Sequence, residues 1–235
     1  MERRQDRGAE VLLQSVLLGL PEGRCDFQPS QGTPRLMKPK TDDNSLHQLL
    51  VEIRDCRICE RDLPCGPRPI VAADRDARIL IIGQAPGSRV HESGVPWDDP
   101  SGQRLREWMG IEPSVFYDET KIALVPMGFC YPGSGKSGDL PPRPECAEHW
   151  HQKLLAELID VKLTLVIGTY AQRSRLGESR KATLTATVQA WKEYRPACLA
   201  LPHPSPRNNI WLKKNPWFQK EVLPYLQSRV KRLLK

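Results

Sequence analysis

The sequence predicts an α/β fold in which a four-stranded parallel sheet carries helices on both faces. Four short runs rich in Ile, Leu and Val recur along the chain, with helical patterns between them, at residues 78–83, 121–127, 163–168 and 198–202. Continuous apolar runs of this length are typical of strands buried on both faces of a parallel sheet. A chain of 235 residues is long enough to bury one such core. We therefore expect one domain over residues 44–235.

Helices are predicted from apolar residues that recur every three to four positions. The first begins at Asn44 or Ser45 and delivers a pair of cysteines, and the last begins at Asn215 and contains Pro224, a site for a bend. The others span 101–109, 144–159, 170–176 and 183–194, the last capped by Thr183. Residues 88–100 are expected to form a loop. Residues 1–43 lack sustained periodicity and are expected to form a poorly ordered extension with, at most, a short helix at 11–20.

Positive charge is concentrated at the C-terminal end. The chain has a formal net charge of +7, and residues 203–235 contain eight Lys or Arg against one Glu. A basic segment of this kind fits a polyanionic partner, because phosphate contacts supply sequence-independent affinity, although a solvated basic helix fits the charge equally well. No apolar run approaches the ~18 residues of a membrane span, and no signal cleavage site follows residues 11–20. We therefore expect a cytoplasmic protein without membrane contact.

Two short loops follow the first and the last predicted strand. GQAPG occupies residues 83–87 and HPSPRNN occupies residues 203–209. Ligands of parallel α/β sheets bind outside the carboxyl ends of the strands, so the two loops should face one crevice. A phosphate-binding loop is a weaker interpretation of GQAPG, because neither dinucleotide-binding nor P-loop glycine spacing is present.

GQAPG with a downstream HPSPRN resembles the signature motifs of the uracil-DNA glycosylase superfamily, whose members flip a damaged base out of DNA and cut its N-glycosidic bond. The resemblance extends over residues 46–234 and is most marked to the iron–sulfur branch, family 4. It implies a three-layer α/β/α sandwich, a monomer, DNA as partner, and hydrolysis of the bond between uracil or another deaminated base and deoxyribose.

The resemblance also implies roles for individual residues. His203 would donate a hydrogen bond to the base carbonyl oxygen, an electrostatic stabilisation worth about 3 to 4 kcal/mol for comparable donors. A lone histidine is more often structural, and the surrounding HPSPRN favours function. Trp97 would stack on the flipped base. The alternative for Trp97 is packing in the core. The base-binding set is Gly83, Ala85, Trp97 and Asn208. The DNA-binding set is Ser205, Arg207, Lys213 and Lys214, with Arg207 or Ile210 filling the gap that the flipped base leaves.

Four cysteines form two pairs. Cys56 and Cys59 make a C-x2-C pair, and Cys130 and Cys146 lie in a segment, 129–146, whose glycines and prolines predict a loop. The spacing matches the cluster ligands of family 4, so the resemblance implies a four-iron four-sulfur (4Fe-4S) cluster. A structural zinc ion is the alternative, since zinc also takes four thiolates, and four unliganded cysteines remain a further possibility. The sequence assigns no role to Cys25, Cys65 or Cys198.

The motifs depart from the family pattern at three positions. Family 4 carries a glutamate at the place of Gln84, other relatives carry an aspartate at that of Ala85, and the uracil-reading asparagine falls on Pro126. The water must then be activated by another group in the loop after GQAPG, which contains His91, Glu92, Asp98 and Asp99. We expect His203, Gln84, Asp98 and Asp99 to form the catalytic set, with Asp98 or Asp99 activating the water, and a base range broader than uracil.

Two other functions fit the same residues. Loss of the usual carboxylate is also compatible with a catalytically weak or inactive protein that binds DNA or a damaged base. An enzyme that acts on a free nucleoside or nucleotide is the second alternative, and it would show little affinity for oligonucleotides.

Overall fold

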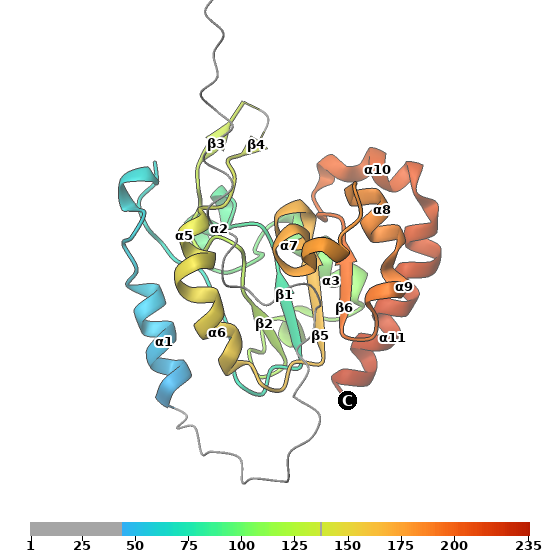
Figure 1. Cartoon of the computed structure of the whole chain (residues 1–235), viewed down its shortest axis with the longest axis horizontal. Coiled ribbons are helices and arrows are strands. Elements are labelled where there is room, and N and C mark those ends of the chain that lie inside the picture. Colours follow the sequence, from blue (N-terminus) through green and yellow to red (C-terminus); the bar gives the residue numbers. More distant parts are fainter. Residues whose placement is uncertain (1–43, 137) are drawn as a thin grey trace, which may run out of the picture.

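The computed structural model describes residues 44–136 and 138–235 (Figure 1). The predicted extension at 1–43, with its short helix and Cys25, lies outside the described residues. Within the described ranges, no helix is long and apolar enough to cross a bilayer.

The centre of the fold is a four-stranded, all-parallel sheet in the order β2-β1-β5-β6. The strands are β1 (Ile79–Ile82), β2 (Ile122–Leu124), β5 (Leu163–Ile167) and β6 (Cys198–Leu201). The register pairs Leu80 with Ala123 on one side and with Thr164 on the other. All four predicted strands are confirmed, because each apolar run is buried on both faces as its composition requires.

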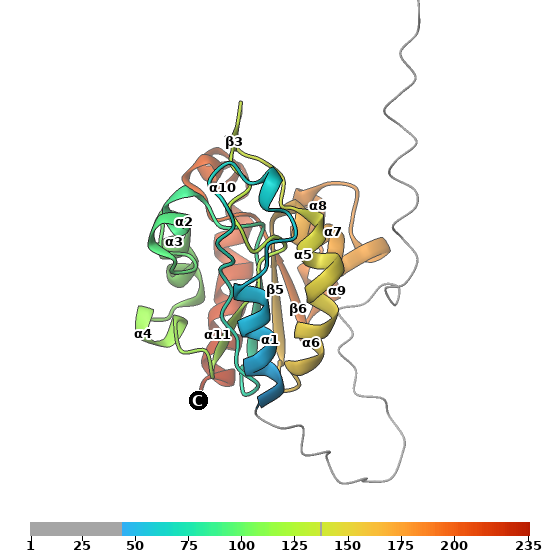
Figure 2. The same cartoon turned by 90° about the vertical axis from the view of Figure 1, so that its left-hand side faces the viewer.

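Helices cover both faces of this sheet, which makes a three-layer α/β/α sandwich (Figure 2). Even-numbered residues of β1, such as Leu80, pack against α1 (Asn44–Arg54), α6 (Gln152–Glu157) and α7 (Gly168–Leu176). Odd-numbered residues, such as Ile81, pack against α3 (Pro100–Met109) and α11 (Leu223–Leu233). The alternation follows from the two-residue period of a strand, which sends successive side chains to opposite faces.

Several helix boundaries differ from the predictions. The predicted loop at 88–100 contains α2 (Ser88–Ser93), which ends at Gly94 in the left-handed conformation. The helix predicted at 183–194 is divided into α8 (Leu184–Gln189) and α9 (Trp191–Tyr194), although Thr183 caps it as expected. α4 (Pro113–Phe116) was not anticipated. It is a single turn, too short for a hydrophobic period to be visible.

Two of the longer predicted helices contain a π-helical turn, which is wider than an α-helical turn. The helix predicted at 144–159 is built from α5 (Pro144–Cys146), a π-helical turn (Ala147–His151) and α6. The C-terminal helix begins with a π-helical turn (Phe218–Val222) and continues as α11, with Pro224 in its first turn. Proline cannot donate to the carbonyl four residues earlier, which accounts for the wider turn before it. A separate helix, α10 (Asn209–Lys214), precedes it.

A small hairpin stands above the carboxyl ends of the sheet. It consists of β3 (Ser134–Gly135) and β4 (Gly138–Asp139), paired antiparallel. Its segment of sequence, rich in glycine, was predicted as a loop. Short 3-10 turns complete the fold at Glu60–Asp62, Gly177–Ser179 and Pro206–Asn208.

The central strand provides a test of the packing. Ile81 is fully buried between β2 and β5, whereas Ile159 is 47% exposed after α6. Ile81→Ala should lower the free energy of unfolding by about 2 to 5 kcal/mol, because it removes buried methyl groups and leaves a cavity. Ile159→Ala, the same substitution at the surface, should change it by less than about 0.5 kcal/mol. Urea unfolding of both variants measures the difference, and equal effects would contradict the assignment of the core.

Candidate functional site

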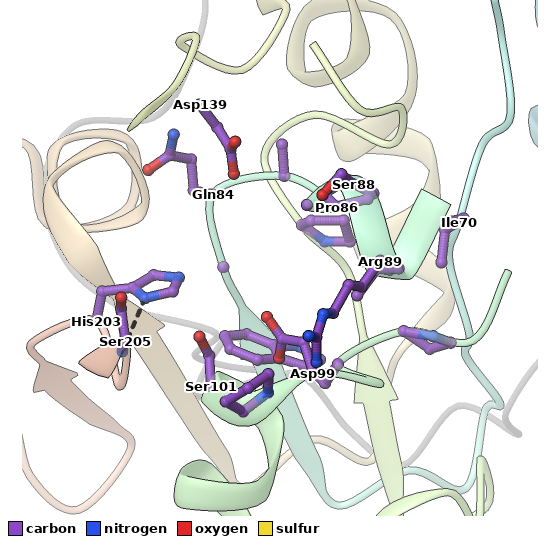
Figure 3. Close-up of a pocket in the computed structure, with 18 of the residues that line it drawn as sticks. Ile70, Gln84, Pro86, Ser88, Arg89, Asp99, Ser101, Asp139, His203 and Ser205 are labelled. Atoms are coloured by element: carbon purple, nitrogen blue, oxygen red, sulfur yellow. Dashed lines mark hydrogen bonds between the residues drawn. The ribbon is translucent and has the colours of Figure 1, made fainter. Parts of the chain in front are cut away.

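A pocket of about 550 Å³ opens at the carboxyl ends of the strands (Figure 3). Residues of GQAPG after β1 and of HPSPRNN after β6 both line it. The two loops meet because β1 and β6 lie on either side of β5 and run in the same direction. β5 turns directly into α7 at Gly168, whose φ of +81° suits glycine.

Trp97 packs on the wall of this pocket that Gly83 forms. A Cβ added to Gly83 would lie 2.8 Å from Cζ2 of the indole, so only glycine admits the ring there. Trp97 adopts a left-handed backbone conformation, with a φ of +59°, and its ring is stacked on that of His203 with a centroid distance of 5.8 Å. The indole therefore presents an aromatic surface between the two loops.

Helix α3 fixes the Trp97 loop. Asp99 caps the helix by accepting a hydrogen bond from the backbone N of Gly102 at 2.7 Å. Gly102 has no side chain, which lets the carbonyl of Trp97 approach its backbone. The guanidinium of Arg106 donates to that same carbonyl at 3.4 Å. Two residues earlier in α3, Arg104 donates to the carbonyl of Ser205 at 3.1 Å, so α3 holds both loops.

His203 enters the pocket from the end of β6. Its Nδ1 accepts a hydrogen bond from the backbone N–H of Ser205 at 3.2 Å. Burial lowers the pKa of the His203 ring, and the nearby carboxylates of Asp99 and Asp139 oppose this shift. A neutral ring whose Nδ1 is an acceptor carries its proton on Nε2. The site therefore holds a neutral N–H donor.

The loop after His203 is ordered by its own side chains. Asn208 donates to the carbonyl of His203 at 2.7 Å, and the hydroxyl of Ser205 accepts from the backbone N of Arg207 at 3.2 Å. The hydroxyl proton of Ser205 remains available to an incoming acceptor. Ser205, Arg207 and Asn208 line the pocket. The other predicted residues that line it are Gly83, Gln84, Ala85, Trp97, Asp99 and His203.

Other predicted residues lie outside the pocket lining. Asp98 bonds through its backbone N to the carbonyl of Val95, and the geometry favours Asp99 over it as a residue of the site. His91 and Glu92 belong to α2, and their carbonyls accept from the guanidinium of Arg68. Lys213 and Lys214 are exposed in the last turn of α10.

Several pocket residues were missed by the sequence analysis, among them Arg89, Ser101 and Asp139. Arg89 and Ser101 reach the pocket from α2 and α3, and Asp139 reaches it from the hairpin (Figure 3). Arg89 and Ser101 follow GQAPG in the chain, at the start of the segment and of the helix that come after it. Their closeness to the motif in sequence is a signal that could have identified them. Asp139 is separated from both motifs along the chain and lies in a glycine-rich segment, so no spacing signal distinguished it.

The four paired cysteines converge on one region beside the site. Cys59, Cys130 and Cys146 are buried, and Cys56 is half-buried after α1. The indole Nε1 of Trp150 donates to Sγ of Cys56, and the backbone N of Phe129 donates to Sγ of Cys146, both at 3.4 Å. The guanidinium of Arg143 forms ion pairs with Asp62, at 3.1 Å, and with Glu145. The pair with Asp62 joins the two segments that contain the cysteines.

The thiols influence one another electrostatically. The pKa of Cys130 is raised to about 11 and that of Cys146 to about 12, chiefly by burial and to a smaller extent by the charges of the neighbouring thiols Cys56 and Cys59. Thiols with such pKa values are protonated at neutral pH, and a metal would have to displace the protons. Over residues 44–136 and 138–235, no group of three or more His, Cys, Asp or Glu side chains is arranged to hold a metal ion.

Comparison with protein families gives a match that covers both functional loops. The model of the uracil DNA glycosylase superfamily matches residues 70–227, about two thirds of the chain. The matched region contains both loops, α3, the hairpin, Cys130 and Cys146. Cys56 and Cys59 precede it, so the match does not distinguish the iron–sulfur branch.

The protonation of His203 can be measured directly. Because its pKa is lowered, the ring should take up a second proton only at a pH below its usual 6.5, and at pH 7 it should carry one proton, on Nε2. Asp139→Asn should lower this pKa further, since it removes a negative charge that favours the protonated ring. A two-bond ¹H–¹⁵N spectrum across a pH series reports both properties. Asp76→Asn, an exposed site before β1, should change neither. A proton on Nδ1 at pH 7 would contradict this description.

Proposed function

The chain belongs to the uracil DNA glycosylase superfamily, and from this we propose that it is a DNA glycosylase that hydrolyses the N-glycosidic bond of uracil or another deaminated base. We further propose that it acts as a cytoplasmic monomer. The observation that carries the activity is the neutral Nε2–H of His203, which faces a pocket whose wall is the indole of Trp97.

This arrangement suits a base that has left the DNA stack. An aromatic surface binds a flipped base at about 1 to 3 kcal/mol, and Trp97 supplies it. When the C1′–N bond breaks, the bonding electrons stay on the base, whose carbonyl oxygen gains negative charge. The Nε2–H of His203 would donate a hydrogen bond to that oxygen. A donor that is already fixed, here by Ser205, stabilises the developing charge without reorganising.

The sugar side of the reaction gains positive charge, which a carboxylate stabilises. Asp99 lines the pocket and lies close enough to His203 to affect its pKa. Because its Oδ1 accepts from Gly102, this carboxylate is held in one orientation by the N-terminus of α3. We assign to Asp99 an electrostatic role toward the oxocarbenium-like sugar.

The base range should extend beyond uracil. Pro126 lines the pocket but offers no side-chain donor, and its carbonyl is bonded to the buried His151 at 3.0 Å. Selection would then rest on the carbonyl that His203 contacts, which uracil, hypoxanthine and xanthine all possess. This is the physical basis for proposing more than one substrate base.

The loop after β6 would contact the DNA backbone and the gap in the duplex. Ser205 retains a hydroxyl proton for a phosphate, and Lys213 and Lys214 add positive charge beyond the pocket. Arg207 lies against Gly138 of the hairpin. Ile210, 67% exposed at the start of α10, is an apolar side chain at the surface there. We therefore assign Ile210, rather than Arg207, to the space that the flipped base vacates.

Base release from oligonucleotides tests the proposal. The wild-type protein should release uracil, hypoxanthine or xanthine from labelled strands, and His203→Ala should slow the single-turnover rate by about 10²- to 10³-fold, as loss of one oxyanion-type donor does. His47→Ala, an exposed histidine on α1, is the matched control and should leave the rate unchanged.

Other outcomes select the other functions. DNA binding that weakens with salt, without release of any base, would assign the protein to the non-catalytic binders. Little affinity for oligonucleotides, with cleavage of a free nucleoside, would indicate a nucleoside enzyme.

We also propose that Cys56, Cys59, Cys130 and Cys146 hold a 4Fe-4S cluster, with zinc as the alternative. The support is the gathering of four thiols and the two N–H donors to sulfur, a kind of contact that tunes such clusters. Binding would require the four sulfurs to close around the group. The cluster would fasten α1 to the segment after β2 and would supply structure rather than a chemical step.

Metal content tests this proposal. Protein purified without oxygen should be brown and contain about four iron and four sulfide per chain, and Cys56→Ala should lose both. Cys65→Ala, at an exposed cysteine, should retain them. Colourless protein with one zinc per chain would establish the alternative, and folded protein without either metal would exclude both.

A further inference from the structure

Asp139 brings a carboxylate to the mouth of the pocket from outside both motifs. It ends β4 and lines the pocket, and its Oδ2 is 3.6 Å from the point where a Cβ on Gly87 would lie (Figure 3). It is also one of the two carboxylates that raise the pKa of His203. Asp139 is therefore next to GQAPG and within electrostatic reach of the donor histidine.

The hairpin that bears Asp139 is attached to both functional loops. Nε2 of Gln84 donates to the carbonyl of Leu140 at 3.4 Å. On the other side, Arg207 packs against the backbone of Gly138. The residues on either side of Asp139 are thus each in contact with one loop, which places its side chain over the gap between the loops.

The other polar groups that line the pocket are poor acceptors for a proton from water. Gln84 is an amide, and it is used as a donor to Leu140. Asp99 has one oxygen committed to the cap of α3. Among the described residues, the carboxylate of Asp139 has no hydrogen-bond or ion-pair partner, and the residue is exposed at the entrance by which water arrives. Its carboxylate can orient toward a water molecule at no cost to another contact.

We propose that Asp139 is the catalytic residue that activates water in this protein, an inference that rests on the proposed glycosylase activity. The C1′–N bond breaks, and its electron pair leaves with the base, whose charge His203 stabilises. The water oxygen forms a bond to C1′ while one water proton moves to the carboxylate of Asp139. That proton later passes to the solvent or the released base, which restores the carboxylate. Asp99 stabilises the sugar from its fixed position, so the two carboxylates have separate roles.

The test compares three isosteric substitutions in single-turnover base release. Asp139→Asn should slow release by about 10²- to 10⁴-fold, the usual contribution of a general base, while affinity for the same damaged strand stays within about threefold. Asp99→Asn should keep the cap of α3, because the amide oxygen can accept from Gly102 in the same way, and should slow release by less than Asp139→Asn does. Asp76→Asn, at an exposed residue before the amino end of β1, removes the same charge and should leave rate and affinity unchanged.

The outcomes separate this inference from the function on which it rests. If wild-type protein releases base and Asp139→Asn releases it at a similar rate, the role of Asp139 is wrong and the glycosylase proposal stands. A parallel loss of rate and of affinity in Asp139→Asn would also overturn the catalytic role, because it would assign the residue to the shape of the pocket. If wild-type protein releases no base, the proposed function fails first and Asp139 has no water to activate.

Discussion

The contact between the indole of Trp97 and the backbone of Gly83 is the constraint on which the rest of the site depends. The ring can lie there only because residue 83 has no side chain, and it reaches this place through a left-handed backbone at Trp97. The carbonyl that follows is accommodated by Gly102 and held by Arg106. The left-handed backbone of Trp97 is a strained conformation that costs free energy. Such a conformation persists only where the surrounding structure holds it in place.

The same contact aligns the two halves of the pocket. His203 is stacked on Trp97, and the N–H of Ser205 fixes the orientation of its ring. An aromatic surface and a neutral donor are thereby set against each other before any ligand arrives. Preorganisation of this kind is what lets a donor act on charge that exists only during bond breaking.

The elements that were predicted well from the sequence are those with a continuous apolar run or a clear helical period. Ile79 to Ile82 and the other strands are continuous apolar runs, and the helix ending at Met109 has a clear cap and period. The short elements were missed or merged, because a helix such as α2 shows less than two full periods and Ala190, between α8 and α9, is a good helix former.

The candidate site was predicted to a similar degree. Residues in the two motifs or in the loop after GQAPG, such as His203 and Trp97, line the pocket as their positions in the chain suggested. Asp139 could not be found in this way. Its position depends on a hairpin whose strands are only two residues long, and on contacts that Gln84 and Arg207 make with that hairpin. The missing carboxylate of GQAPG indicated that another group was needed without indicating which one.

The cysteines and the hairpin connect these observations. Cys130 and Cys146 flank the segment that contains β3 and β4, so a group bound by the cysteines would restrain the two ends of the strand pair that carries Asp139. A metal site would then be coupled to the pocket through the backbone, without taking part in the reaction.

The most direct test of the account is a crystal structure of the protein with an oligonucleotide that contains 2′-fluoro-2′-deoxyuridine, whose glycosidic bond resists hydrolysis. We expect a flipped base stacked on Trp97, with a carbonyl oxygen within hydrogen-bond distance of Nε2 of His203. A base that remains in the helix, or that enters the pocket with its carbonyl groups directed away from His203, would contradict it.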